Sequence, residues 1–152
     1  MKSLYSQTTP GTEILLLQET KLPEEACLKQ TGFVEMRGGS SFWNEAAFSA
    51  QTGRFKDGTS IVLSAKMSRI VTHHGILYPG RAQYVVLQIS PTLRLGIINV
   101  YGFSNTGPRA MMWSHLAQVN LPEAQWVLAG DFNNIESVAD KQGGSAKTSI
   151  SN

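Results

Sequence analysis

An apolar run leads straight into polar residues in the stretch Trp126-Val127-Leu128-Ala129-Gly130-Asp131-Phe132-Asn133. The run predicts a short strand that ends where an acidic residue and an amide stand two positions apart. Successive strand side chains point to opposite faces, so Asp131 and Asn133 are expected to project together. Such a pair can orient a water molecule and a phosphate, although Asp-Phe-Asn is also typical of an ordinary turn.

Two earlier predicted strands also end in polar residues. The apolar run at 14–17 leads into Gln18 and Glu19, and the run at 95–98 leads into Asn99 and Tyr101, which share a face. Ligands of open α/β sheets usually gather beyond the carboxyl ends of the strands. One rim is therefore expected to collect the polar residues of all three strands, namely Glu19, Asn99, Tyr101, Asp131 and Asn133.

The oxygen ligands of this predicted rim favour Mg²⁺ over zinc. Mg²⁺ binds through one or two carboxylates together with water and substrate phosphate, whereas zinc prefers clusters of Cys and His, which the sequence lacks. Taken singly, each residue has a simpler interpretation. Glu19 also suits a solvated or capping position, and Tyr101 suits half-buried packing. The hypothesis of a site depends on the residues occurring together.

The remaining pattern predicts one domain in which strands and helices alternate. Strands are expected at 42–48, 60–65 and 69–72, a turn at 51–58, a hairpin at 83–89 and 93–101, and helices at 23–29 and 108–119. In the second helix, Met112, Leu116 and Val119 form an apolar stripe typical of core packing. Residues 1–136 are assigned to the domain, and the Gly- and Ser-rich residues 137–152 to a mobile tail.

Composition restricts the class of protein without identifying it. A chain of 152 residues with 41% hydrophobic and 16% charged residues is expected to form a single globular domain. A net charge of +2 is too small to indicate a nucleic-acid partner by itself. Cys27 is the only cysteine, so the sequence offers no disulfide framework. Without an apolar run of roughly 20 residues or a secretory leader, a soluble intracellular protein with no membrane contact is expected.

Four motifs follow one another along the chain: Gln18-Glu19-Thr20, Gly58-Thr59-Ser60-Ile61-Val62-Leu63-Ser64, Asn99-Val100-Tyr101 and Gly130-Asp131-Phe132-Asn133. In this order they resemble the signatures of the endonuclease/exonuclease/phosphatase superfamily. Two further segments, the tyrosine motif with its loop and Arg-bearing helix at 99–109 and Asp140-Lys141-Gln142-Gly143-Gly144, are similar to one branch of it. That branch is the apurinic-site-like endonuclease domain of non-LTR retrotransposons.

The resemblance implies a two-sheet α/β sandwich that hydrolyses phosphodiesters with Mg²⁺, or with Mn²⁺ in its place. By motif match, Glu19 would hold the metal and Tyr101 would hydrogen-bond the scissile phosphate. Asp131 would orient or activate the attacking water, and Asn133 would steady the phosphate or the nucleophile. The implied reaction is endonucleolytic nicking of DNA, with the nucleus as the implied location.

Four further residues receive supporting roles by the same match. Gln18 and Asn99 would support the metal ligand and the tyrosine. Asn105 and Arg109 would touch the nucleic-acid backbone, although Arg109 equally suits a solvated first turn of a helix.

The chain also departs from the family pattern. It starts after the family's first strand, it stops before the closing Asp-His pair, and no His follows Asn133. Phe103 stands where the family usually has Pro. Members of a catalytic site act together, so these departures predict weak or lost activity and open sheet edges that promote association. The alternatives are a retroelement-derived remnant that binds metal or nucleic acid without catalysis, and a remnant with no selected function.

Overall fold

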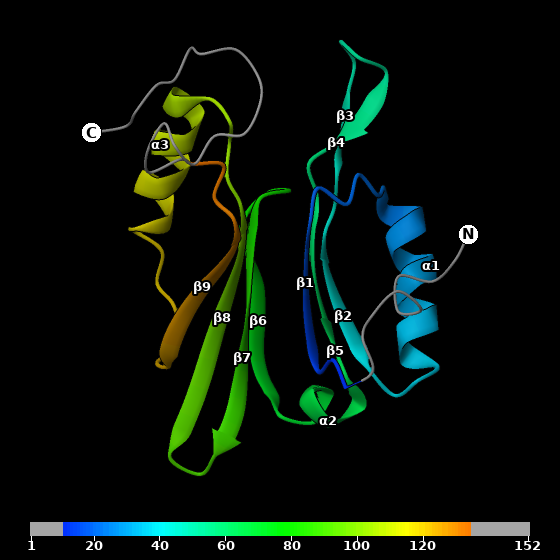
Figure 1. Ribbon diagram of the computed structural model, residues 1–152, viewed down its shortest axis with the longest axis vertical. Helices are drawn as coiled ribbons and strands as arrows, with labels where there is room; N and C mark the ends of the chain where they lie inside the picture. Colours follow the sequence, from blue (N-terminus) through cyan, green and yellow to red (C-terminus); the bar gives the residue numbers. More distant parts are fainter. Residues whose placement is uncertain (1–10, 135–152) are drawn as a thin grey trace.

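Two β-sheets face each other and each carries a helix on its outer side, so that the molecule has four layers (Figure 1). This computed structural model describes residues 11–134. All strand pairs are antiparallel except the pair at one edge of the larger sheet. The predicted α/β sandwich is therefore confirmed as a mixed α/β architecture with mostly antiparallel sheets.

The first sheet has the strand order β1-β5-β2. Its strands are β1 (Ile14–Gln18), β5 (Thr59–Leu63) and β2 (Ser40–Asn44). Every residue of the central strand β5 is buried, in keeping with its position between two strands and beneath the second sheet. Helix α1 (Glu24–Glu35) covers the outer face and buries Cys27, Gln30 and Val34 (Figure 1).

The second sheet has the order β6-β7-β8-β9. Its strands are β6 (Val71–Tyr78), β7 (Ala82–Ser90), β8 (Leu93–Tyr101) and β9 (Gln125–Asp131). β9 runs parallel to β8, because helix α3 (Thr106–Leu116) carries the chain back along the outer face before β9 begins. Met112 of α3 is fully buried against this sheet, together with Ala82 and Val100.

A short hairpin and a single helical turn complete the described part of the chain. The hairpin consists of β3 (Ala47–Ser49) and β4 (Arg54–Lys56), and it projects beyond the end of β1 (Figure 1). Helix α2 (Ala65–Ser68) takes the chain from the first sheet to the second. Ser64 caps this helix by accepting a hydrogen bond from the Met67 amide.

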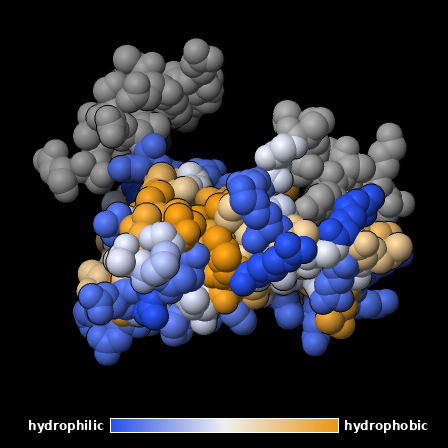
Figure 2. Space-filling view, turned by 90° about the horizontal axis from the view of Figure 1, so that it is seen from below, coloured by the Kyte–Doolittle hydropathy of each residue, from blue (hydrophilic) through white to orange (hydrophobic). Residues whose placement is uncertain are grey.

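The space between the sheets is apolar at one end and polar at the other. The apolar end contains Ile61, Leu63, Val85, Leu87 and Ile97, all buried and in mutual contact. Figure 2 views this end, where apolar side chains reach the surface between polar ones. The polar end is reached along the same strands and buries Thr59, Ser60, Gln83 and Asn99. The side chains of Gln83 and Asn99 are hydrogen-bonded there, whereas Thr59 Oγ1 and Ser60 Oγ have no partner among the described residues, which is unusual for buried polar atoms.

The strand predicted at 42–48 is wrong in one respect, because it is interrupted. β2 ends at Asn44, which is 2% exposed and reaches across to the second sheet. Its side-chain Nδ2 donates to the carbonyl oxygens of Tyr78 and Ala82, and its Oδ1 accepts a hydrogen bond from the backbone N–H of Gly80. The chain therefore leaves the sheet at Asn44 and enters the hairpin at Ala47.

Other boundaries differ by smaller amounts. Residues 51–58, predicted as a turn, contain β4, and Ala65 begins α2 instead of ending β5. Residues 69–72 do not extend the first sheet, since β6 starts at Val71 in the second sheet. The first helix continues to Glu35. The second ends at Leu116, so Val119, predicted as part of its apolar stripe, lies beyond the helix. The predicted hairpin at 83–101 is confirmed.

Within residues 11–134, no helix is long and apolar enough to cross a membrane. β9 lies at the edge of its sheet with Val127 and Leu128 exposed, and association through this edge stays a prediction. The predicted tail at 137–152 and the segment at 140–144 lie outside the described residues.

Candidate functional site

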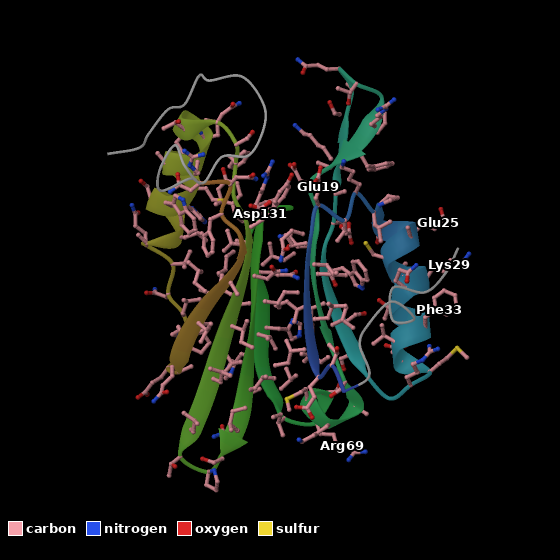
Figure 3. The ribbon with its side chains drawn as sticks, viewed as in Figure 1. Glu19, Glu25, Lys29, Phe33, Arg69 and Asp131 are labelled. Carbon is pink, nitrogen blue, oxygen red and sulfur yellow. The ribbon has the colours of Figure 1, made fainter. Side chains whose placement is uncertain are left out.

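The ends of three strands form one rim of the sandwich, as the sequence predicted. Glu19 follows β1, while Tyr101 and Asp131 are the last residues of β8 and β9 and are direct neighbours in the parallel register. Figure 3 shows Glu19 and Asp131 at the same end of the molecule, on facing sheets. The candidate carboxylates and the tyrosine therefore come from both layers of the sandwich.

Glu19 lies in a tightly held loop. Glu19 and Lys21 both have left-handed backbone angles, with φ of 52° and 53°, which non-glycine residues seldom adopt. The loop is fixed by hydrogen bonds from the amides of Thr20 and Lys21 to the carbonyl oxygens of Gly58 and Asp57. Lys21 Nζ lies 2.8 Å from Glu19 Oε1, and about half of each side chain is exposed. The carboxylate predicted to hold a metal is thus already beside a cation.

Charged side chains from both sheets surround Tyr101. Burial raises the pKa of the Tyr101 hydroxyl, and the negative charge of Glu19 raises it further. The positive charge of Arg81 opposes this rise, and Asp57 and Asp131 add to it. The hydroxyl therefore stays protonated at neutral pH and can donate a hydrogen bond. Tyr101 and Asp131 are register partners, and Glu19 lies on the facing sheet at the same end of the molecule, so both carboxylates lie at the end of the sandwich that carries the tyrosine.

Gln18 and Asn99 support the rim from below. Asn99 is fully buried, and its side chain donates to the carbonyl oxygens of Leu17 and Ser60, both at 2.9 Å. Its oxygen accepts a hydrogen bond of 2.6 Å from Gln18 Nε2. All three bonds join the first sheet to the second. These two residues therefore hold the end of β1 against the end of β8.

The segment after β9 is joined to the end of β8. The Gly102 amide donates to the Asp131 carbonyl oxygen at 2.6 Å, and Asn133 Nδ2 donates to the Gly102 carbonyl oxygen at 2.6 Å. A Cβ atom on Gly102 would lie 2.3 Å from the Phe132 carbonyl oxygen, so only glycine permits this approach. The tyrosine motif and the Asp-Phe-Asn motif thus form one unit.

Asp131 and Asn133 do not share a strand face in the way that was predicted. The strand ends at Asp131, and Asn133 takes a left-handed φ of 48°, so the alternation of strand side chains no longer applies. The two residues nevertheless lie in contact, because the backbone N–H of Asn133 donates a hydrogen bond to Asp131 Oδ1 at 2.9 Å. The juxtaposition comes from a turn, which was the alternative interpretation of this segment.

Arg109 is buried. It therefore fits neither of its predicted positions, in contact with the nucleic-acid backbone or solvated in the first turn of a helix. It is 7% exposed, and its guanidinium donates to the carbonyl oxygens of Phe103, Ser104 and Asn133. Arg109 therefore holds together the loops that follow β8 and β9. Asn105 is exposed at the N-cap of α3 without a side-chain capping bond, so its amide is available to a ligand.

Sequence reasoning missed Arg81 and Asp57. Arg81 is 9% exposed, and its guanidinium lies 4.3 Å from the ring centre of Tyr101 and 4.0 Å from that of Phe103. It pairs with Asp57 at 2.7 Å and donates to the Gly102 carbonyl oxygen at 2.9 Å. The phenylalanine that departs from the family pattern is thus one side of an arginine stack. Asp57-Gly58 is a recognisable turn signal, but no local pattern connects it with Arg81.

The side chains at the rim provide few ligands for a metal ion. Within the described part of the chain, no three His, Cys, Asp or Glu side chains come together as a metal site. His74 packs on the Phe42 ring and His115 lies against the Leu77 carbonyl oxygen. The carboxylates that the described strand ends bring to the rim are those of Glu19 and Asp131. This donor set fits Mg²⁺, which needs only one or two protein carboxylates beside water and phosphate, and does not fit structural zinc.

One surface depression of the described residues lies away from the rim. It lies at the far end of the second sheet, between the β7–β8 turn and the start of β9, and none of the predicted site residues lines it. Comparisons with models of protein families and with curated proteins found no match to this chain.

Proposed function

We propose that the rim formed by Glu19, Tyr101 and Asp131 is a divalent-metal-dependent site for hydrolysis of DNA phosphodiesters. The observation that carries the proposal is the arrangement of three strand ends: Tyr101 and Asp131 are register partners at the ends of β8 and β9, and Glu19 follows β1 on the facing sheet at the same end of the molecule. Two carboxylates beside a protonated hydroxyl match what phosphodiester hydrolysis needs, namely a metal ligand, a group that activates water and a hydrogen-bond donor for the phosphate.

Each residue then has a specific task. Glu19, whose carboxylate is half-exposed, would hold Mg²⁺, which supplies positive charge to the phosphoryl oxygens when it is bound. Tyr101 would donate a hydrogen bond to a phosphate oxygen and keep its proton, and the leaving oxygen would take a proton from solvent water as its bond to phosphorus breaks. Asp131 orients the attacking water and accepts its proton, since Asp131 already receives the Asn133 amide and is held in place. Asn133 completes the contact with the phosphate.

We also propose a specific superfamily for the sandwich fold. Four motifs in the order of the endonuclease/exonuclease/phosphatase superfamily lie in this chain, and three of them supply the rim residues and their supports. The proposed type of sandwich is that of the superfamily, and the proposed branch is the apurinic-site-like endonuclease of non-LTR retrotransposons. Fold resemblance alone does not define a reaction, so the proposed reaction depends on the rim residues.

A second candidate function is binding of metal or nucleic acid without hydrolysis. The observation that favours it is the pairing of Glu19 with Lys21 at 2.8 Å. A metal ion would have to compete with this ammonium group. Weak metal occupancy with retained DNA binding would be the signature of this second function.

The test is nicking of supercoiled plasmid by the purified protein, with Mg²⁺ and with EDTA. Asp131→Asn keeps the side-chain oxygen that receives the Asn133 amide but removes the base, so nicking should fall about 100-fold or more. Glu19→Gln should have a similar effect. Glu13→Gln is the matched control, because Glu13 is a partly exposed glutamate that pairs with Lys66 and directly precedes β1, at the other end of the strand from Glu19.

The outcomes separate the candidate functions. Nicking that EDTA, Asp131→Asn and Glu19→Gln each abolish, and that Glu13→Gln retains, supports hydrolysis at the rim. Nicking that persists in Asp131→Asn would identify a contaminating nuclease and refute the proposal. A folded protein that binds DNA without nicking it would support the second candidate.

A further inference from the structure

The hairpin β3–β4 exposes a pair of aromatic rings. Phe48 and Phe55 are direct cross-strand partners, with ring centres 5.5 Å apart and an interplanar angle of 64°. They are 61% and 37% exposed, and neither belongs to the two core clusters of the described residues. Single exposed apolar side chains are common on protein surfaces, whereas two rings in contact form a contiguous apolar surface of the kind that can bind a ligand.

The same hairpin carries positive charge. Arg54 and Lys56 flank Phe55 in β4, and all three residues of this strand are exposed. Among the ion pairs of residues 11–134, none involves Arg54 or Lys56. The nearby carboxylate of Asp57 is already neutralised by Arg81 at 2.7 Å. Side chains alternate along a strand, so Arg54 and Lys56 project to the face opposite the two rings, and a ligand that uses both must pass around the edge of this narrow hairpin. A nucleic-acid strand, with flat bases on one side and phosphates on the other, has that arrangement of groups.

The base of the hairpin is fixed to the loop that carries Glu19. Hydrogen bonds of 2.9 Å and 3.1 Å run from the amides of Lys21 and Thr20 to Asp57 and Gly58, just after β4. A third, of 3.1 Å, joins the Ala46 amide, just before β3, to the Leu22 carbonyl oxygen. Figure 1 shows the hairpin projecting from the same end of the molecule as the rim. A ligand that lies along the hairpin therefore reaches the candidate site.

We propose that the β3–β4 hairpin binds unpaired nucleotides of DNA next to the phosphate that is cleaved, with bases stacked on Phe48 and Phe55 and phosphates paired with Arg54 and Lys56. The identity of the strand as substrate rests on the proposed function, whereas the binding itself does not. Base stacking on aromatic side chains and a positive path for the backbone are the two elements of single-strand recognition. Duplex DNA hides the faces of its bases and can use only the cations.

The experiment measures binding of a fluorescent oligo(dT) and of a matched duplex by anisotropy, without metal and at several salt concentrations. The double variant Phe48→Ser/Phe55→Ser should weaken oligo(dT) binding about tenfold or more and leave the salt dependence unchanged. The double variant Arg54→Gln/Lys56→Gln should reduce the slope of log affinity against log salt by about 1.4, at about 0.7 for each lost phosphate contact.

Two controls test whether any exposed residue has these effects. Ile76→Ser removes an exposed apolar side chain of β6, which is 58% exposed, and Arg94→Gln removes an exposed cation near the far end of β8. Neither should change oligo(dT) affinity by more than about twofold. All the substituted side chains are exposed or partly exposed, so the variants should retain the wild-type circular dichroism and melting temperature.

The results distinguish this proposal from the proposed function. Hairpin-dependent oligo(dT) binding without Mg²⁺-dependent nicking supports the hairpin and refutes hydrolysis. Nicking at the rim with oligo(dT) affinity unchanged in the phenylalanine double variant refutes the hairpin and leaves hydrolysis standing. Absence of oligo(dT) binding by the wild-type protein also overturns the hairpin proposal, and the exposed rings would then suit a protein partner.

Discussion

Replacing Asn99 with leucine removes the hydrogen bonds that join the two sheets beneath the rim. Asn99 is fully buried, and leucine has a similar size, so the substitution tests polar contacts more than packing. It deletes the bonds to the carbonyl oxygens of Leu17 and Ser60 at 2.9 Å and the bond from Gln18 at 2.6 Å. Each of these partners belongs to the first sheet, while Asn99 belongs to the second.

The expected loss in the free energy of unfolding is about 3 kcal/mol, at about 1 kcal/mol for each hydrogen bond. Two carbonyl oxygens left in the interior add to this cost, because no water reaches them easily. A domain of this size is typically stable by only about 5–15 kcal/mol. With an m value of about 1.5 kcal/mol/M, the midpoint of urea unfolding should fall by about 2 M. Tryptophan fluorescence can follow the transition.

Gln18→Leu is the matched control, because it deletes only the bond to Asn99. It should cost about 1 kcal/mol, and the double variant should cost less than the sum because the two residues share a bond. A loss of less than about 1 kcal/mol for Asn99→Leu, or equal losses for the two single variants, would refute the inter-sheet role of Asn99.

Three further predictions concern the rim and the outer layers. Gly102→Ala should destabilise the fold by about 1–3 kcal/mol, since its Cβ would meet a carbonyl oxygen at 2.3 Å, whereas Gly107→Ala, with nothing within 4 Å, should not lower the melting temperature. Lys21→Met should tighten Mn²⁺ binding in calorimetry by roughly two- to fivefold, while Lys66→Met, which breaks a similar exposed pair, should not; equal affinities would argue against metal at the paired carboxylate. Burial raises the pKa of the Cys27 thiol from 9.0 to about 11, so the folded state keeps a proton that the unfolded chain loses, and stability should fall over this range by up to about 1.4 kcal/mol per pH unit. Urea unfolding at alkaline pH should show this slope in the wild type and lose it in Cys27→Ala.

The contrast between the ends of the sandwich bears on where function can evolve. At the apolar end, side chains such as Leu63 and Leu87 need only fill space. At the polar end, Asn44 and Asn99 must each find partners on the opposite sheet. Such directional bonds fix the relative position of the two sheets where the rim residues emerge. A site that draws residues from both sheets needs this rigidity.

Several features of the protein follow from the sequence alone. The apolar runs before Glu19, Tyr101 and Asp131 predicted strands, and the Ser90-Pro91-Thr92 break predicted the hairpin between β7 and β8. The grouping of the three strand ends at one rim was also predictable. These features depend on side chains within a few positions of one another, and hydrophobic periodicity and turn preferences act at that range.

Only the tertiary structure revealed how the rim is held. Arg81 stacks between Tyr101 and Phe103 and pairs with Asp57, although nothing near Arg81 in the sequence indicates a buried cation. Arg109 resembles a solvated helix residue in the sequence and is buried in the fold. The sequence specifies which segments become strands because that choice is local. Burial, pairing and exposure depend on which distant segments meet, and that is decided only when the two sheets pack together.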